Sequence, residues 1–241
     1  MQNRFVMMHY LKKQAENGTA DEKTEYADWM VYNCPDQIND TNIDMIKACY
    51  MVGIKEKDVR AMLGMGLLYE EGYGETENIP AAMRLYRRAY KTTKDEYEEQ
   101  MSATLLARLY LESEKPEDWE TAGDLICEVG ENMTDLMFAP YAMVMGDMQK
   151  SGTGLKKSPH SAYESYIVAK SVILSTEENR RFLPDMLIRY GEIYAFGLYV
   201  PKDPLKAEGY FAEAEDLLGS GRRSRMNRER IRKDRAAMIA R

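Results

Sequence analysis

The feature that most constrains the fold is a pattern of small and aromatic residues that recurs along the chain at fixed offsets. In residues 58–90 the pattern consists of Gly66, Gly72, Gly74, Ala82, Tyr86 and Ala89. Residues three or four apart lie on one face of a helix, so the last three place small, large and small side chains side by side. Small residues let two helices cross closely, and an aromatic ring fills the space between their turns. The stretch therefore predicts two short helices joined by a glycine-marked loop.

The same offsets return twice more, almost intact. Residues 141–170 carry Gly146, Gly152, Gly154, Ala162, Tyr166 and Ala169. Residues 189–215 carry Gly191, Gly197, Ala207, Phe211 and Ala214, with Tyr199 in place of the second loop glycine. A weaker copy without the loop glycines contains Ala107, Tyr110, Ala122 and Ile126. Similarity at an offset of roughly 20–50 residues is typical of a solenoid, so the sequence predicts an all-α stack of helix pairs.

These residues resemble the Sel-one-like (Sel1-like) repeat, a relative of the tetratricopeptide repeat. Residues 61–89 match the pattern of that family at Ala61, Gly66, Leu68, Tyr69, Gly72, Gly74, Ala82, Tyr86 and Ala89. They depart from it at Glu75, Asn78 and Ala81, where the family has valine, aspartate and lysine. The resemblance covers about residues 58–218. It implies an α/α solenoid of antiparallel helix pairs, with about ten to twelve helices stacked as a right-handed superhelix.

The chain divides into three parts in this interpretation. We expect residues 1–55 to form N-terminal helices that are a diverged repeat or a cap. Residues 56–219 are expected to hold about four repeat units, and residues 220–241 a basic helix. Four prolines, Pro80, Pro116, Pro159 and Pro204, stand where second helices should begin. Proline suits the first position of a helix because the N–H group that it lacks would be unpaired there.

Side-chain caps are expected at several helix ends. Ser158 and Asp203 precede two of these prolines as N-caps. Thr19 and Glu22 predict a capping box for a helix over about 20–32. Gly53 is expected to close the helix that contains Ile43 and Ile46.

Composition limits the compartment and the chemistry. The sequence contains no run of 18 apolar residues, so no membrane span is predicted. The N-terminus lacks the long apolar core of a signal peptide. The three cysteines, Cys34, Cys49 and Cys127, are widely spaced and odd in number, which indicates buried free thiols and a reducing, cytoplasmic location. Two histidines cannot make a histidine-rich metal site, and we expect no cofactor.

No catalytic group is predicted. The run from Gly152 to Lys157 has glycines and lysines, but a phosphate loop needs a strand before it, and here a helix precedes the glycines. Adjacent glutamates such as Glu98 and Glu99 point in different directions on a helix, whereas acid–base pairs need a shared or buried site. We therefore expect a protein that is not an enzyme.

The C-terminal tail differs in charge from the rest of the chain. Residues 221–241 contain nine basic and two acidic residues, a balance of +7, while the whole chain carries −7 and residues 1–220 therefore −14. The tail could be a solvated capping helix, could lie against the acidic body or an acidic partner, or could bind nucleic acid or an anionic surface. Its lack of aromatic residues and the acidic body argue against nucleic acid.

The resemblance to tetratricopeptide repeats implies a binding groove, since the first helices of such repeats line the concave face. The matching positions in this chain are Arg60, Leu67, Glu70, Arg108, Asp147, Lys150, Asp185 and Glu192. Their mixed charges suggest a protein or peptide partner of unknown identity, bound by an adaptor or scaffold. Two alternatives stay open: binding of nucleic acid or an anionic surface by the tail, and an immunity-type inhibitor whose acidic body binds a basic partner. The oligomeric state is not indicated.

Overall fold

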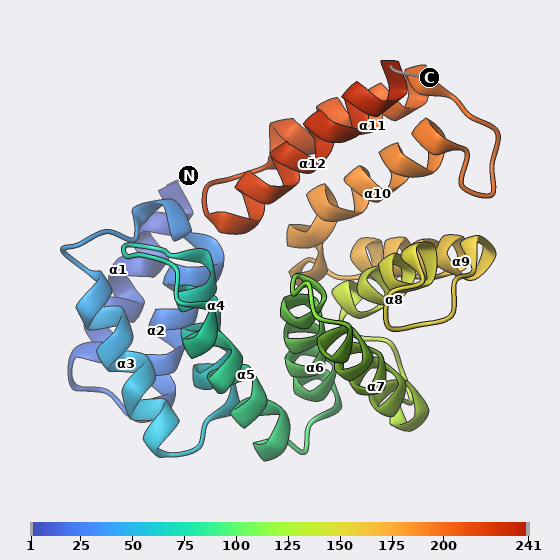
Figure 1. The fold of residues 1–241 in the computed structure, drawn as a ribbon. Coiled ribbons are helices and arrows are strands. Elements are labelled where there is room, and N and C mark those ends of the chain that lie inside the picture. Colours follow the sequence, from blue (N-terminus) through green and yellow to red (C-terminus); the bar gives the residue numbers. More distant parts are fainter. Residues whose placement is uncertain (1, 240–241) are drawn as a thin grey trace. The chain divides into compact units, whose positions relative to one another are not determined.

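The computed structural model describes residues 2–239, and residues 1, 240 and 241 lie outside the described part. The described chain is all-helical, with twelve α-helices in consecutive antiparallel pairs (Figure 1), so the predicted fold class is confirmed. The first six helices are α1 (Gln2–Asn17), α2 (Ala20–Asn33), α3 (Ile43–Lys55), α4 (Val59–Glu71), α5 (Ile79–Thr92) and α6 (Glu96–Leu111). The second six are α7 (Pro116–Asn132), α8 (Ala139–Ser151), α9 (Pro159–Ser175), α10 (Leu183–Phe196), α11 (Pro204–Leu217) and α12 (Arg222–Ile239). Two 3-10 helices, η1 (Pro35–Gln37) and η2 (Glu178–Phe182), lie between them.

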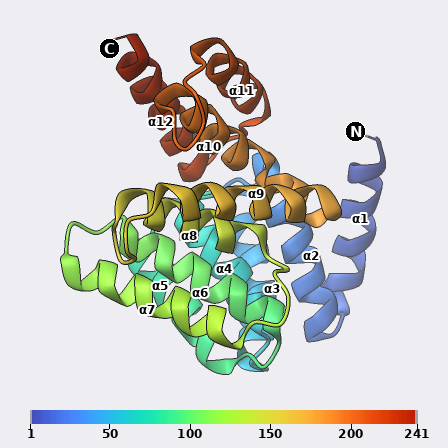
Figure 2. The ribbon, with the colours of Figure 1, turned by 90° about the vertical axis from the view of Figure 1, so that its right-hand side faces the viewer.

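The helices form two compact units. Unit 1 comprises residues 1–102 and 220–222, and unit 2 comprises residues 103–219 and 223–241. Within unit 2, α8 packs along α9 and α10 packs along α11 (Figure 2). Whether residues 1–55, 56–219 and 220–241 act as separate domains stays a prediction.

The residues that start the helices are those that the sequence indicates. Each of the four prolines stands in the first turn of a second helix, α5, α7, α9 or α11. The side chains of Ser158 and Asp203 accept hydrogen bonds from the backbone N–H groups of Ser161 and Lys206. The capping box of Thr19 with Glu22 begins α2. These predictions are confirmed.

The recurring glycines allow the two helices of a pair to cross closely. A Cβ atom placed on Gly66 would lie 2.4 Å from the ring of Tyr86. A Cβ on Gly191 would lie 2.3 Å from the ring of Phe211. Both rings are fully buried, so they have no room to move aside. Gly146 and Tyr166 repeat this contact between α8 and α9, and we call these three contacts the helix crossings.

The second loop position shows how closely the last repeat follows the others. Gly154 has φ +73°, and Tyr199, at the corresponding place, has φ +65°. A left-handed backbone costs a residue with a Cβ about 1–2 kcal/mol, and Tyr199 offsets part of this by stacking on His160 with ring centroids 4.4 Å apart. The loop path is therefore kept although the glycine is lost.

Two local predictions are wrong. Gly53 does not close its helix, since α3 continues to Lys55. Gly53 is a packing residue instead, because a Cβ atom there would lie 2.5 Å from Oγ1 of Thr24. Cys34 and Cys49 are buried as expected and form no disulfide among the described residues, but Cys127 is exposed. Cys127 lies on α7 outside the buried face that Ala122, Ile126 and Val129 form. Among residues 2–239 no helix is both long enough and apolar enough to cross a membrane.

Candidate interaction groove

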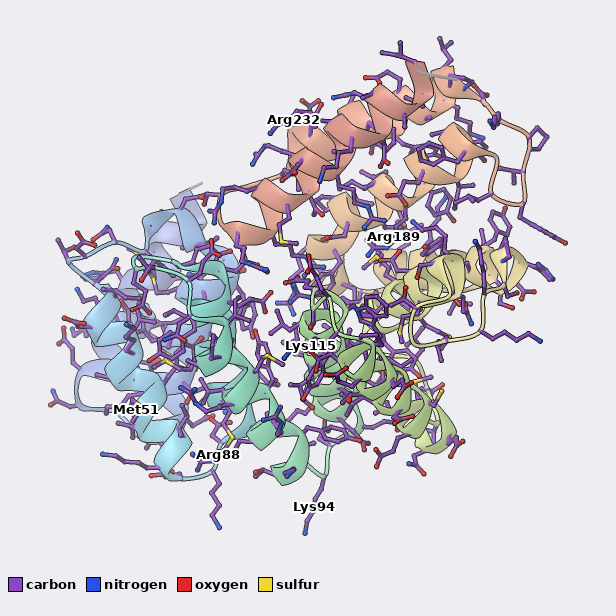
Figure 3. The ribbon with its side chains drawn as sticks, in the orientation of Figure 1. Met51, Arg88, Lys94, Lys115, Arg189 and Arg232 are labelled. Atoms are coloured by element: carbon purple, nitrogen blue, oxygen red, sulfur yellow. The ribbon has the colours of Figure 1, made fainter. Side chains whose placement is uncertain are left out.

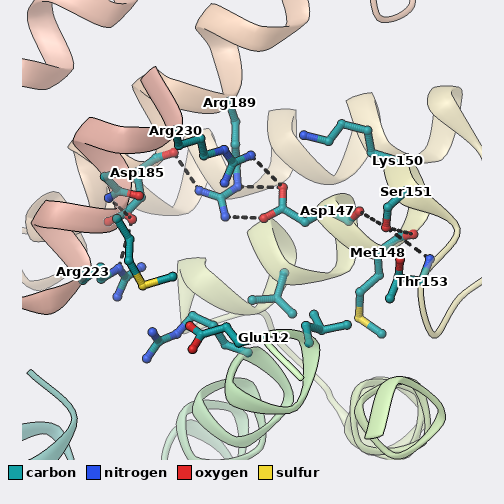
Figure 4. A pocket seen from close by; sticks show the side chains of 15 residues that line it. Glu112, Asp147, Met148, Lys150, Ser151, Thr153, Asp185, Arg189, Arg223 and Arg230 are labelled. Carbon is teal, nitrogen blue, oxygen red and sulfur yellow. Dashed lines mark hydrogen bonds and ion pairs between the residues drawn. The ribbon is translucent and has the colours of Figure 1, made fainter. Parts of the chain in front are cut away.

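Charged side chains from three helices of unit 2 meet in one place. Asp147 lies on α8 and Asp185 on α10, and Arg223 and Arg230 of α12 face them (Figure 4). Glu192, also on α10, pairs with Arg230. We call these three carboxylates the acidic seat. Helices α8 and α10 are the first helices of two successive repeats. Asp147 and Glu192 directly follow the crossing glycines of these helices, and Asp185 lies six residues before Gly191.

Asp147 follows the crossing glycine Gly146 directly, and Arg189 pairs with it from α10. Nε of Arg189 donates to Oδ1 of Asp147 at 3.0 Å, and a second guanidinium nitrogen donates to Oδ2. The hydroxyl of Tyr166 donates to Oδ1 at 2.8 Å. Burial alone would raise the pKa of Asp147, but the charges of Arg189, Arg230 and Lys150 outweigh it and lower this pKa well below its usual range. Asp147 is therefore ionised at neutral pH.

Glu192 follows the next crossing glycine, Gly191, and receives two cations. Nη2 of Arg230 on α12 donates to Oε2 of Glu192 at 2.8 Å, and Nε of Arg230 pairs with Oε1. Lys150 of α8 also pairs with Glu192. Burial would raise the pKa of Glu192, yet Arg230 and Lys150 lower it to about 2. Two parallel bonds from one guanidinium fix both the position and the rotation of α12 at this point.

Asp185 binds α12 one to two turns nearer to the start of that helix than Glu192 does. Its Oδ1 accepts from Nε of Arg223 at 3.0 Å and from Nδ2 of Asn227 at 2.9 Å. Burial opposes ionisation, but the charges of Arg223 and Arg189 lower the pKa of Asp185. Arg189 also donates to the backbone carbonyl of Asp185 at 2.8 Å, so one buried arginine joins two members of the seat.

A fourth carboxyl group, that of Asp234 on α12, is placed differently. Burial and the negative charge of Glu192, with which it forms a hydrogen bond, raise the pKa of Asp234 to about 7, and Arg230 and Lys150 oppose this shift. Oδ2 of Asp234 is buried and finds no hydrogen-bond partner among the described residues. The pKa of Asp234 is therefore close to neutral, whereas that of Glu192 stays low.

Beside the seat lies a cavity of about 340 Å³. It is bordered by Asp147 and Asp185 of the seat and by four apolar side chains, those of Leu111, Val144, Met148 and Met226. Arg108, on α6, also borders it. The cavity is large enough for a few side chains of a bound segment.

Five of the eight expected groove residues lie in unit 2 and three in unit 1. Arg108, Asp147, Lys150, Asp185 and Glu192 all border the cavities beside α12 in unit 2. The remaining three belong to unit 1. Arg60 pairs with Asp21 and Asp58, Leu67 is half-buried, and Glu70 is fully buried and accepts a hydrogen bond from Tyr86 at 2.8 Å.

The sequence did not indicate which arginines pair with the carboxylates of the acidic seat. Arg189 is 8% exposed and lies among the side chains of unit 2, whereas Arg232 of α12 is exposed (Figure 3). Arg189, Arg223 and Arg230 have no counterpart in the repeat pattern. The excess of basic residues in the tail and of acidic residues before it was the available signal, but it could not say which residues pair.

The arrangement is suited to recognition, because each carboxylate of the seat meets a guanidinium with charge-assisted hydrogen bonds. Among residues 2–239 no group of three or more histidine, cysteine, aspartate or glutamate side chains is placed to hold a metal ion.

Comparisons with known proteins agree with this architecture. A family model described as the Sel1 repeat matches residues 59–91, 140–164 and 184–217. No curated protein matches the chain. Among solved structures, a protective antigen of uropathogenic Escherichia coli strains that displays an SLR fold has a TM-score of 0.59 and 14% identity, over 97% of this chain and 48% of that one. This chain thus spans about half the length of that antigen. A Sel1 repeat protein from Oxalobacter formigenes has a TM-score of 0.50 and 16% identity, over 95% of this chain and 96% of that one.

Proposed function

The chain belongs to the Sel1 repeat family, and from this premise we propose that it is a non-enzymatic adaptor or scaffold. Repeats of this family typically mediate protein interactions. In this proposal a peptide or protein segment binds along the first helices of the repeats, at the groove residues of unit 2. Stacked repeats hold such residues rigidly before binding, which lowers the entropic cost of association.

One observation carries the proposal: the first helices α8 and α10 already hold a helix. Their carboxylates bind Arg223, Asn227 and Arg230 of α12 through directed hydrogen bonds. A surface that orders one helical segment by side chains at repeat-variable positions has the chemistry needed to bind another.

Affinity capture from the native host, read by mass spectrometry, tests the proposal. The bait proteins are the wild-type chain, the groove variant Asp185→Asn/Glu192→Gln, and a control variant Glu213→Gln/Asp216→Asn. The control removes the same two charges from exposed positions of α11. We expect the wild type and the control to capture the same protein and the groove variant to lose it. Capture of nothing by the wild type, or of the same protein by all three, would contradict the proposal.

The pairing of basic residues in α12 with other groups of unit 2 supports the alternative, binding of nucleic acid by the tail, less than it supports protein binding. Arg223, Arg230 and Arg235 pair with carboxylates of unit 2, and Arg228 donates to the carbonyl groups of Leu218 and Gly219. These pairings use cations that a phosphate backbone would need.

We propose that the protein binds its partner in a reducing compartment such as the cytoplasm, because its three cysteines form no disulfide among the described residues. Labelling of exposed Cys127 by a membrane-permeant thiol reagent in intact cells, but not by an impermeant one, is the expected result. Equal labelling by both reagents would contradict it.

A further inference from the structure

We propose that the groove of unit 2 recognises basic helices that present arginine, asparagine and arginine at positions i, i+4 and i+7. In this proposal α12 is a built-in occupant, and the basic helix of a partner protein displaces it. The inference rests on the proposed function and names the partner class for the same site.

The spacing comes from α12 itself. Arg223, Asn227 and Arg230 are four and three residues apart, so they lie on one face of the helix. Ile231, next on that face, is fully buried. Arg223 and Asn227 bind a single aspartate, Asp185, and Arg230 spans the distance to Glu192. The groove therefore reads positions along a helix, which a disordered basic chain would not match.

The seat requires a cation. Without α12, three carboxylates would face each other and would lose the charges of Arg223 and Arg230, while Arg189 and Lys150 would remain. Asp147 and Glu192 already repel one another, since the charge of Asp147 acts to raise the pKa of Glu192. A neutral or acidic occupant would leave this negative charge without compensation, and a phosphate backbone would be repelled.

The apolar contribution to holding α12 is small. Ile231 is the fully buried apolar side chain of α12, while Met226 is 42% exposed and Ile239 is 87% exposed. By contrast, α11 buries Ala207, Phe211 and Ala214 completely. Most of the specific contacts of α12 are thus ion pairs and hydrogen bonds, which a second helix with the same residues can reproduce.

Fluorescence anisotropy with a labelled peptide of residues 221–239 tests the proposal. The receiving proteins are the full wild-type chain and its variant Arg223→Gln/Arg230→Gln, in which the resident helix is weakened but retained. Because the resident helix competes from a high effective concentration, we expect the peptide to bind the variant at least ~10-fold more tightly than the wild type. Circular dichroism and thermal melting establish that the variant is folded.

Two altered peptides separate recognition of spacing from attraction of charge. The first carries Arg223→Gln and Arg230→Gln, and we expect it to lose at least ~10-fold in affinity. The second carries Arg232→Gln and Lys233→Gln at exposed positions, removes the same charge, and should stay within ~2-fold of the original. Equal weakening of both peptides, or no binding to the receiving variant, would overturn the proposal.

Hydrogen exchange of the wild-type chain gives a second readout that needs no variant. An excess of the peptide, made with heavy nitrogen so that its fragments are distinguishable, should speed amide exchange in residues 223–239 of the chain. Unchanged exchange at saturating peptide would show that α12 is not displaced. If these tests fail while affinity capture still depends on Asp185 and Glu192, the partner class is wrong but the proposed function stands.

Discussion

Two of the helix crossings and two residues of the acidic seat are neighbours in sequence but differ in physical character. Gly146 and Gly191 are packed against aromatic rings, and the residues that follow them, Asp147 and Glu192, are charged and bind α12. The crossings recur because close packing of two helices admits few solutions. In these two repeats one position packs the helix pair, and the next carries a charge that contacts α12.

The largest effect should come from a crossing. Gly191→Val places a branched side chain where a Cβ alone would be 2.3 Å from the fully buried ring of Phe211. We expect the free energy of unfolding of unit 2 to fall by about 3 kcal/mol or more, measured by chemical denaturation.

Gly209 of α11 is the matched control, since nothing lies within 4 Å of a Cβ built on it. Gly209→Ala should stabilise the protein by about 0.5–1 kcal/mol because alanine favours the helix. Comparable destabilisation by both substitutions would mean that the crossings are not sterically special.

An intermediate effect should come from the seat. Glu192→Gln removes the carboxylate that Arg230 and Lys150 share, and leaves Arg230 with the longer contact of 3.7 Å to Asp147. We expect a loss of about 2–3 kcal/mol, toward the lower end for buried charge pairs because both cations are partly exposed. Thermal unfolding measures it, with exposed Arg232→Gln as a control that should change stability by less than about 0.5 kcal/mol.

A smaller, pH-dependent effect should come from Asp234. Its pKa is about 7 in the folded protein and near 4 when unfolded, so the folded state binds the extra proton between these values. The free energy of unfolding should therefore fall as pH rises from about 5 to 8, by about 1 kcal/mol after allowance for solvent screening. Asp147, Asp185 and Glu192 have lowered pKa values, and their contribution is lost only below about pH 4.

Asp234→Asn isolates this contribution. Denaturation at several pH values between 5 and 8 should show a flatter dependence in the variant than in the wild type. The same slope in both proteins would assign the dependence to another group.

The smallest effect should come from Tyr199. Replacement by glycine relieves a left-handed backbone but removes the stacking on His160 and adds chain entropy to the unfolded state. These terms nearly cancel, so we expect a change within about 0.5 kcal/mol in chemical denaturation. A loss above about 2 kcal/mol would indicate that the aromatic contact holds the loop.

The helix crossings could be predicted from the sequence, whereas the ion pairs of the acidic seat could not. The crossings, the proline starts and the caps at Thr19, Ser158 and Asp203 depend on local geometry, so the sequence indicates them directly. The prediction for Gly53 was wrong because, in sequence, a glycine that packs near a helix end cannot be distinguished from one that ends the helix.

The seat depends on contacts between residues 38 or more positions apart, such as Arg230 with Glu192 and Arg189 with Asp147. Repeat offsets indicated where Asp147, Asp185 and Glu192 stand on their helices. They held no information on the basic residues that face them, because only folding brings α12 to α8 and α10.

A double-mutant cycle between Glu192 and Arg230 tests most directly whether the variable position next to a crossing glycine holds α12. The free energy of unfolding of unit 2 is measured for the wild type, Glu192→Gln, Arg230→Gln and the double variant. If Glu192 holds α12 through Arg230, we expect a coupling energy of about 1.5 kcal/mol or more, as for close buried charge pairs. A coupling energy below about 0.3 kcal/mol would contradict it, because the two residues would then act independently.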